Sequence, residues 1–488
     1  MKNKLQERSA LFFHCVFLIF CSCTATATVS VCRLTALCDP GLSFFKTIGF
    51  ALLFAVISAC YLRFFCSRFG VAGCLAVCFI IRFIFVSCVQ VEPFSDFRLY
   101  HTMAEAMAKG EPLFSQYGSV FPHTIGFSWL LSLVYRVFGA NVFIVQLIHV
   151  FLETLTAYLL YLCTIHLFDK TIGILAAFIY TISPAFLFYS ELLATEIIFT
   201  LLVFVLLYLA IRYAEQNKLR HALLFGALSA LSNGIRPMGM VLMLAFGICT
   251  VCFLKHKRCL IALGLALICY FGVWFGVGYG LSSINGQEIA KAPLGYNLYI
   301  GSNYHTLGKW NPEDYRYANE LIYQKNLSAS EFHKQLQQEG IARYRENGIR
   351  KNTELFVQKF AVLWGSEMLP CDYLNRSKLF SELDGILHFK NISNGFHLFL
   401  MVSVLLGAVF WNKKSKHMGV FFILLFVFGV TCQHLIAEVQ ERYSYTALAL
   451  LMPIAAYGVK RCYKKGAKLF VQATSGRYQS GDGKRPRR

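Results

Sequence analysis

The sequence predicts an all-α polytopic membrane protein with about 12 transmembrane helices, juxtamembrane helices in the first external loop and one larger external loop. The 488 residues are 57% hydrophobic and only 15% charged, whereas soluble domains carry about 25% charged residues. Apolar runs of about 20 residues, the length that crosses a bilayer, recur along the chain. The net charge of +20 comes mainly from loops that alternate with these runs, as the positive-inside rule requires.

The first apolar run has two interpretations. A basic N-terminus precedes it and Ala25-Thr26-Ala27 follows it, which is typical of a signal peptide with a cleavage site. The run is equally typical of an uncleaved first span, and both alternatives deliver the chain to the outside. Further spans are predicted at 47–64 and 71–90, so that Asp96 emerges on the extracytoplasmic side. Apolar residues at helical spacing within 91–110 then predict a short amphipathic helix on the membrane surface.

Four apolar segments follow, and one of them is not expected to cross the membrane. Their ranges are 122–138, 142–167, 171–189 and 197–213. If all four crossed, the acidic Glu191–Glu196 turn would lie inside and the basic residues after Ile211 outside, which reverses the positive-inside rule. We therefore predict that 122–138, which contains Arg136, is a juxtamembrane or re-entrant helix beside the Asp96 loop.

The remaining apolar segments alternate without conflict and place both termini in the cytoplasm. Spans are predicted at 221–235, 238–254, 259–280, 393–411, 417–436 and 444–459. Basic residues within 255–258 and 413–416 then lie inside, and the segment 355–369 is expected on the outer surface because another crossing would reverse the later charges. Within the large external loop, 297–311 is rich in Gly, Asn and aromatic residues, a composition typical of binding loops, and 328–350 predicts a polar helix.

The chain is expected to divide into five parts. They are N-terminal extra spans (1–70), a catalytic transmembrane module with the Asp96 loop (71–280), an extracytoplasmic loop region (281–392), C-terminal spans (393–459) and a basic cytoplasmic tail (460–488). Topology alone accounts for the basic charge, so nucleic-acid binding is excluded and the tail is expected to face lipid headgroups. The 18 Cys lie mostly inside apolar runs, which argues against a disulfide framework or a zinc site.

Four polar groups are placed on the outer side by this topology. They are Asp96, the Glu191/Glu196 turn, Arg236 and the cluster from Glu438 to Tyr443. Each has a structural alternative: Asp96 could be a solvated turn residue or a helix N-cap, and Arg236 could tie its hairpin to Glu196 or Glu441. Charged residues that face a cavity at the ends of spans are nevertheless functional candidates by default.

These residue types suit group transfer from a lipid phosphate. A carboxylate can take the proton of an attacking hydroxyl. An Arg can bind a phosphate ester and stabilise it as the leaving group. Arg236, at the tip of a tight hairpin and directly before Pro237, is placed for two hydrogen bonds to phosphate oxygens.

The order of these residues resembles the membrane-embedded C-type glycosyltransferases, in particular the bacterial family 39-like branch. The matching pieces, between about residues 80 and 459, are Arg82, Ser95-Asp96, Tyr100, Ala104, Phe138-Gly139, Ser183-Pro184, Tyr189-Ser190, Thr195-Glu196, Arg236-Pro237, Gly301-Ser302-Asn303 and Gln440-Glu441-Arg442-Tyr443. Two features depart from the family pattern. The family often carries a second acidic residue beside the loop Asp, where Phe97 stands here with Glu92 and Glu105 nearby, and only Pro453 follows where relatives commonly have two prolines.

The resemblance implies a hexosyl- or pentosyltransferase that uses a polyprenyl-phosphate sugar and inverts the anomeric carbon, with Asp96 as the catalytic base. The acceptor would be a glycan, a lipid or a protein, and the site would lie at the extracytoplasmic face of the cell membrane. Arg236, Arg442 and Tyr443 are the candidates for binding the donor phosphate and lipid. Further site candidates are Tyr100, Glu196, Glu441, Asn303 and Lys309. The residues form no metal-ligand motif, although a divalent metal is compatible with them.

Two other functions stay open. A polysaccharide polymerase or ligase also joins lipid-linked glycans at the outer face and uses arginine-rich loops. A transporter or flippase would carry out no chemistry, but it should have inverted repeats and broken helices near the midplane of the membrane. The sequence contains no paired half-helices, and its polar groups gather at one surface, so a glycosyltransferase is the favoured interpretation.

Overall fold

The computed structural model describes residues 2–39, 41–253, 258–325, 327–381, 386–411 and 418–479. These residues form helices and connecting turns, with no strand among them. Seven helices are long and apolar enough to cross a membrane: His14–Cys38, Phe44–Cys88, Val142–Leu167, Thr195–Gln216, Arg258–Asn285, Ile386–Val409 and Met418–Ile436. The prediction of an all-α polytopic membrane protein is confirmed.

A helix lies at each of the twelve positions at which the sequence predicts a span. These helices are α1 (Lys2–Cys38), α2 (Phe44–Cys60), α3 (Cys66–Cys88), α7 (Val142–Leu167), α8 (Lys170–Thr181), α10 (Thr195–Gln216), α11 (Leu219–Ser232), α12 (Gly239–Phe253), α13 (Arg258–Asn285), α19 (Ile386–Val409), α20 (Met418–Ile436) and α21 (Tyr445–Gln479). Three of them, α8, α11 and α12, have only 12, 14 and 15 residues, whereas about 20 cross a bilayer. The number of crossings therefore stays a prediction.

Two breaks in the helices have clear causes in the sequence. A π-helix, η1 (Tyr61–Phe65), joins α2 to α3. The backbone leaves helical geometry at Gly70 within α3, whose φ of 59° lies in the left-handed region, and this break lies between the two predicted spans. The predicted span 171–189 is wrong in its extent, because α8 ends at Thr181 and a separate helix α9 (Pro184–Tyr189) follows. Pro184 restricts the residue before it to extended backbone, and so it ends the longer helix.

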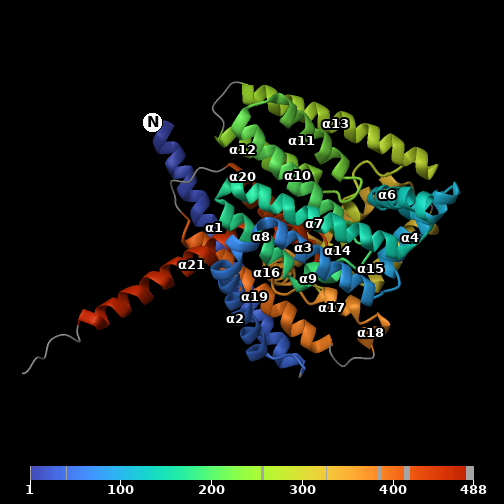
Figure 1. Cartoon of the computed structure of the whole chain (residues 1–488). Coiled ribbons are helices and arrows are strands. Elements are labelled where there is room, and N and C mark those ends of the chain that lie inside the picture. Colours follow the sequence, from blue (N-terminus) through green and yellow to red (C-terminus); the bar gives the residue numbers. More distant parts are fainter. Residues whose placement is uncertain are drawn as a thin grey trace, which may run out of the picture.

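The two ends of the helical bundle differ. The N-terminus of α1 and the far end of α21 project at one end, while α4 (Ser95–Lys109) and α6 (Pro122–Phe138) lie at the other (Figure 1). This arrangement agrees with the predicted placement of both termini on one side, away from Asp96. The basic residues predicted inside at 255–257 and 413–416, and the tail residues 480–488, lie outside the described residues.

The helix α6 lies where the sequence predicts a juxtamembrane helix. It is not among the seven candidate spans, it follows the short helix α5 (Gln116–Val120), and it packs along α4. Arg136 donates from Nη2 to the carbonyl oxygen of Met107 at 3.2 Å. A Cβ on Gly126 would be 2.0 Å from the carbonyl oxygen of Gly234, so α6 also closely contacts the turn between α11 and α12.

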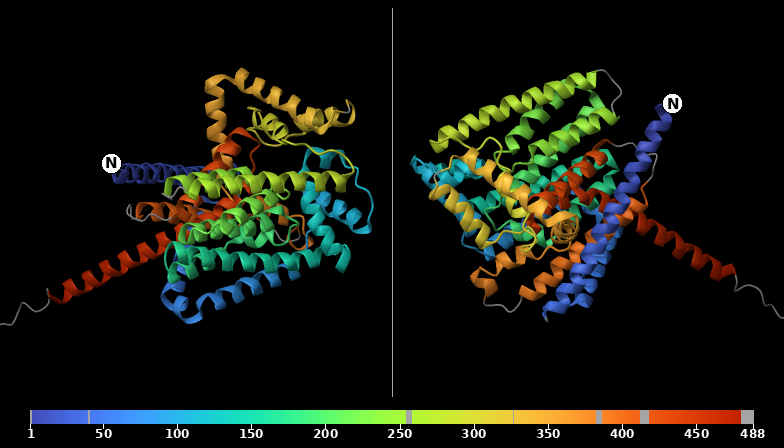
Figure 2. Two further views of the ribbon diagram at one scale, coloured as in Figure 1. Left: turned by 90° about the horizontal axis from the view of Figure 1, so that it is seen from above. Right: turned by 180° about the vertical axis from the view of Figure 1, so that it is seen from behind.

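The large external loop folds into helices of its own. They are α14 (Gly295–Gly301), α15 (Pro312–Tyr323), α16 (Ala329–Trp364), α17 (Leu369–Leu374) and α18 (Lys378–Ser381). A capping box between Ser328 and Glu331 begins α16, as the sequence pattern favours. Gly348, with φ of 65°, divides α16 into two arms, which Figure 2 shows bent outside the bundle. The first arm contains the predicted polar helix, and the second, which covers most of 355–369, is not among the candidate spans.

The second arm of α16 is anchored to α1. The Thr28 hydroxyl donates to the carbonyl oxygen of Trp364 at 3.1 Å. The rings of Phe20 and Trp364 meet edge to face, with centroids 5.4 Å apart. The segment that the sequence leaves open as a signal peptide or a first span therefore packs against α16 of the large external loop. This loop, residues 281–392, is called the external region below.

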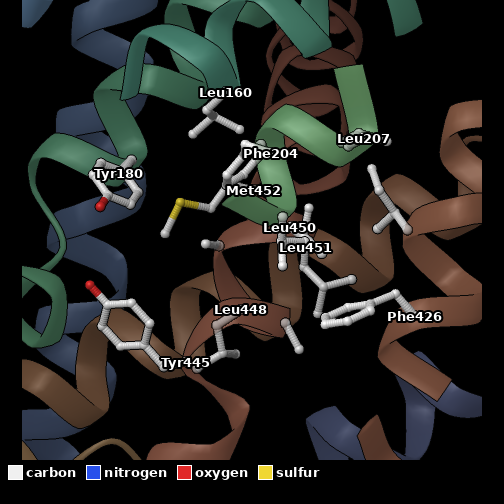
Figure 3. Packing of buried hydrophobic residues seen from close by; sticks show 14 of the residues in the cluster. Leu160, Tyr180, Phe204, Leu207, Phe426, Tyr445, Leu448, Leu450, Leu451 and Met452 are labelled. Carbon is white, nitrogen blue, oxygen red and sulfur yellow. The ribbon is translucent and has the colours of Figure 1, made fainter. Parts of the chain in front are cut away.

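A buried ion pair joins the helices of the bundle. Arg82 Nε donates to Glu153 Oε2 at 2.8 Å, and both side chains are fully buried. Glu153 also accepts hydrogen bonds from the hydroxyls of Ser190 and Tyr445. The Arg82 guanidinium lies 5.1 Å from the centre of the Tyr180 ring, in a core filled by large apolar side chains (Figure 3). Because each buried charge needs its partner, this network fixes α3, α7 and the start of α21 relative to one another.

Candidate functional site

Asp96 is positioned by the start of α4. The residue before it, Ser95, has φ of 46°, a left-handed conformation that costs a non-glycine residue about 1–3 kcal/mol and is common at functional sites. From there α4 buries one face, as the predicted amphipathic helix requires: Phe97, Tyr100, Met103, Ala104 and Met107. The Asp96 carboxylate is left at the N-terminal end of α4, where the helix dipole favours negative charge.

Asp96 faces a cavity of about 700 Å³. Its wall comes from the start of α4, the start of α10, the turn before α12, the segment 433–443 and the external region. Six of the nine side chains predicted for the site line this cavity: Asp96, Tyr100, Glu196, Arg236, Arg442 and Tyr443. Residues up to 347 positions apart in the chain thus meet at one place, beside the start of α4, a helix that lies at the end of the bundle away from the termini (Figure 1).

Two ion pairs organise the charged part of the cavity. Arg442 Nη2 donates to Asp96 Oδ2 at 2.7 Å, and Arg236 Nη1 lies 2.5 Å from Glu196 Oε1. The Asp96 side chain is 35% exposed and that of Glu196 only 3%. The second pair matches the structural alternative for Arg236, in which it ties its hairpin to Glu196. The first pair leaves Asp96 accessible from the cavity.

The Tyr443 ring brings the two arginines together. The guanidinium carbons of Arg236 and Arg442 each lie 5.6 Å from its centre, within the range of a cation–π interaction. On the same ring, His434 stacks with centroids 4.5 Å apart. Tyr443 belongs to the short 3₁₀ helix η2 (Glu441–Ser444) that precedes α21, so this turn delivers both Arg442 and the ring that it shares with Arg236.

Two further titratable side chains, His123 and Glu438, lie beside these ion pairs. Burial, reinforced by the nearby Arg236 cation, lowers the pKa of His123 to about 4, so this imidazole is neutral at pH 7. Burial raises the pKa of the Glu438 carboxyl, whose Oε1 accepts from Gln440 Nε2 at 2.6 Å. Both side chains line the cavity. Asp96 and Glu196 are the carboxylates that form direct ion pairs with the two arginines.

Three predicted site residues lie outside the cavity wall. Glu441 accepts hydrogen bonds from the backbone N–H groups of Met368 and Leu369 and so joins η2 to α17. Asn303 Nδ2 donates to Oδ2 of Asp314, in the first turn of α15, at 2.8 Å. Lys309 is exposed. The Glu441 and Asn303 side chains thus stabilise the segments around the cavity without lining it.

The other acidic candidates are also placed away from the cavity. Glu92 and Glu105, the nearest substitutes for a second loop carboxylate, do not line it, and Glu105 pairs with Lys109 at 2.9 Å. Glu191 accepts from the Val91 backbone N–H at 2.9 Å. Burial raises the pKa of Glu191 to about 8. The hydrogen bond from Val91 to Glu191 fixes the segment that precedes α4.

Sequence reasoning missed most of the outer cavity wall. Tyr296, Trp310, Tyr315 and Tyr323 of the external region line the cavity. Trp310 lies within the stretch 297–311, whose composition predicts a binding loop. The sequence therefore did indicate this part of the wall. Tyr315 and Tyr323 lie on α15, a polar helix with no motif, and only the tertiary structure places them here. Among the described residues, no group of three or more His, Cys, Asp or Glu could hold a metal ion.

A family model described as dolichyl-phosphate-mannose-protein mannosyltransferase matches residues 122–275. The match covers less than half of the chain. It includes Glu196 and Arg236 but neither Asp96 nor Arg442. Over these residues it confirms the resemblance to glycosyltransferases that use lipid-phosphate donors. No curated protein matches the chain.

Three solved structures are weakly similar. The oligosaccharyltransferase AglB from Archaeoglobus fulgidus, in complex with an inhibitory peptide and a dolichol-phosphate, has 14% identity and a TM-score of 0.44, over 85% of this chain and 52% of that chain. An A. fulgidus oligosaccharyltransferase tethered with an acceptor peptide has 16% identity and a TM-score of 0.45, over 82% and 50%. ArnT from Cupriavidus metallidurans bound to undecaprenyl phosphate has 10% identity and a TM-score of 0.37, over 80% and 76%. This chain spans about half the length of the two archaeal chains.

Proposed function

We propose that this protein is an integral membrane glycosyltransferase that moves a sugar from a polyprenyl-phosphate donor to an acceptor hydroxyl. The observation that carries the proposal is the convergence of Asp96, Arg236 and Arg442 on one cavity. It unites a carboxylate that can accept a proton with two cations that can bind a phosphate. The family match over 122–275 supports the same class of donor.

The donor phosphate would bind between Arg236 and Arg442. Both guanidinium groups lie 5.6 Å from the centre of the Tyr443 ring, so a phosphate between the two guanidinium groups could accept hydrogen bonds from each. Guanidinium groups form such bidentate bonds with phosphate oxygens and keep their charge in poorly hydrated sites. As the phosphate arrives, Arg442 would share its charge between the phosphate and Asp96.

Asp96 would act as the general base. The acceptor oxygen attacks the anomeric carbon, the bond from that carbon to the phosphate oxygen breaks, and the phosphate leaves with the electron pair. The proton of the acceptor hydroxyl passes to Asp96, while Arg236 and Arg442 stabilise the leaving polyprenyl phosphate. A single displacement of this kind inverts the anomeric carbon.

The reaction would take place at the extracytoplasmic face of the cell membrane. The helix α4, which begins at Ser95 next to Asp96, lies at the end of the bundle opposite to the N-terminus and the far end of α21 (Figure 1). The basic loops and the tail are predicted to lie at the end with the termini, and basic loops face the cytoplasm.

Incubation of the purified full chain with a panel of polyprenyl-phosphate sugars tests the proposal. We expect at least one donor to be cleaved to polyprenyl phosphate, with its sugar recovered on an acceptor or on water. Intact donor that is only moved between the leaflets of a proteoliposome would identify a flippase instead. Cleavage of a polyprenyl-diphosphate glycan, with no cleavage of the monophosphate donors, would identify a polymerase or ligase.

A further inference from the structure

The wall of the cavity has two chemically different parts. Every charged side chain that lines it comes from the start of α4, the start of α10 or the turns before α12 and α21, whereas the described residues of the external region (281–392) contribute none. Among the described residues, the external part of the wall consists of one amide and five aromatic side chains: Asn297, Tyr296, Trp310, Tyr315, Tyr323 and Tyr373. The charged part and the aromatic part face the same space.

Three of these aromatic side chains are accessible to a ligand from the solvent side. Trp310 is 49% exposed, Tyr315 is 36% exposed and Tyr323 is 56% exposed. The rings of Trp310 and Tyr315 lie with centroids 5.7 Å apart and at 51° to each other, so together they form a corner rather than a stack. Within the described part of the chain, their indole N–H and hydroxyl groups form no hydrogen bond, which leaves these groups available.

The segment that carries these rings is held rigidly. The backbone N–H of Val439 donates to the carbonyl oxygen of Gly308 at 3.0 Å, two residues before Trp310. Asn311 caps the start of α15, and Asp314 in its first turn pairs with Arg343 at 2.8 Å. The aromatic faces are therefore placed before any ligand arrives, which lowers the entropy that binding would cost.

We infer that Trp310, Tyr315 and Tyr323 form the acceptor subsite and that the acceptor is an uncharged saccharide. Flat aromatic faces cover the C–H faces of sugar rings, and their polar tips can hydrogen-bond the hydroxyls. A phosphorylated lipid or a charged peptide would leave its charges without partners on this neutral wall. A polyprenyl tail would enter from the membrane, whereas this wall belongs to the external region. The inference rests on the proposed function for the position of the reacting centre.

Direct binding tests this subsite without a requirement for turnover. The full chain, with and without Asp96→Asn, is titrated with a panel of neutral hexosides, N-acetylhexosaminides and their short oligomers, and binding is followed by saturation-transfer NMR. We expect at least one saccharide to bind, and binding to the Asp96→Asn form would show that it does not require turnover. Trp310→Ala and Tyr315→Ala should weaken this binding about tenfold or more, and Trp310→Phe should restore part of it. Tyr304→Ala is the matched control, because Tyr304 lies in the same loop outside the cavity wall and bonds Glu354 at 2.7 Å.

The outcomes separate this inference from the proposed function. Binding that depends on Trp310 and Tyr315 supports the saccharide subsite even if no polyprenyl-phosphate donor is cleaved. Donor cleavage in a protein that binds no saccharide of the panel overturns the subsite and leaves the proposed function standing. Binding of a Ser/Thr peptide that depends on these two residues would also overturn the saccharide subsite. The subsite would be overturned as well if the Trp310→Ala and Tyr315→Ala proteins had the unfolding temperature of the wild type and bound the saccharide with the affinity of the wild type.

Discussion

At the scale of single residues, the contact between Arg442 and Asp96 is the feature with the clearest consequence. The carboxylate of Asp96, the proposed base, lies 2.7 Å from the guanidinium of Arg442, and the same cation is a candidate for binding the donor phosphate. Donor binding would thus weaken the ion pair between Arg442 and Asp96, and so free the Asp96 carboxylate to accept the proton of the acceptor hydroxyl. Residues 346 positions apart in the chain form this contact, so no sequence pattern could have predicted it, although both residues were candidates.

Arg236→Lys separates the two roles of Arg236. Lys keeps the charge but loses the planar fork that makes two hydrogen bonds to a phosphate. We expect the donor KM to rise about tenfold with a smaller change in kcat if Arg236 mainly binds the ground state. A loss of kcat as well would assign it to leaving-group stabilisation.

The measurement for Arg236→Lys is steady-state kinetics per folded molecule, with thermal unfolding in detergent as its control. Arg236 pairs with Glu196 at 2.5 Å, so a purely structural role is a real alternative. Lower thermal stability with unchanged donor kinetics would remove Arg236 from the site.

At the scale of elements, Lys359 links α16 to the loop beside the cavity. Its side chain is fully buried, and Nζ donates to the carbonyl oxygen of Gly301 at 3.0 Å. Burial lowers the pKa of Lys359 to about 7, while the Glu438 carboxylate acts in the opposite direction. In the unfolded chain this amine has a pKa of about 10.4.

This difference predicts how stability depends on pH. Between pH 7 and about 10.4 the unfolded state binds more protons at this site, so the free energy of unfolding should rise with pH. The rise should be on the order of 1 kcal/mol per pH unit, relative to Lys359→Met, which lacks the titrating group. Unfolding midpoints of both proteins in detergent, measured from pH 6 to 10, check this. Parallel pH profiles would show that Lys359 stays protonated when folded.

The elements themselves were largely predictable, and the exceptions have physical causes. Hydrophobic length and the positive-inside rule placed the apolar helices and singled out 122–138 as a surface helix, because both signals are local. The extent of 171–189 was wrong because Pro184 ends the helix within an apolar run. The way in which the described residues of 281–392 cover the cavity was beyond the sequence, because contacts between residues far apart in the chain, such as the hydrogen bond from the Val439 N–H to the Gly308 carbonyl oxygen, position these helices.

At the scale of the whole molecule, the topology determines every functional placement. Ile300 is buried and unsuitable for labelling, whereas Glu313 and Lys218 are exposed and are predicted to lie on opposite sides of the membrane. In a variant without the native cysteines, Glu313→Cys should react with an impermeant thiol reagent on intact cells, and Lys218→Cys should react only after permeabilisation. The opposite pattern would move the cavity to the cytoplasmic side and contradict the proposed donor geometry.

The most direct test of the central claim is sugar transfer by Asp96→Asn. The substitution keeps the shape of the side chain and removes the base, so transfer from the active polyprenyl-phosphate donor should fall about 100-fold or more per folded molecule. Glu105→Gln is the matched control, because Glu105 lies on the same helix, outside the cavity wall, and pairs only with Lys109 among the described residues; it should transfer as wild type does. Near-normal transfer by Asp96→Asn, with folding unchanged, would contradict the account.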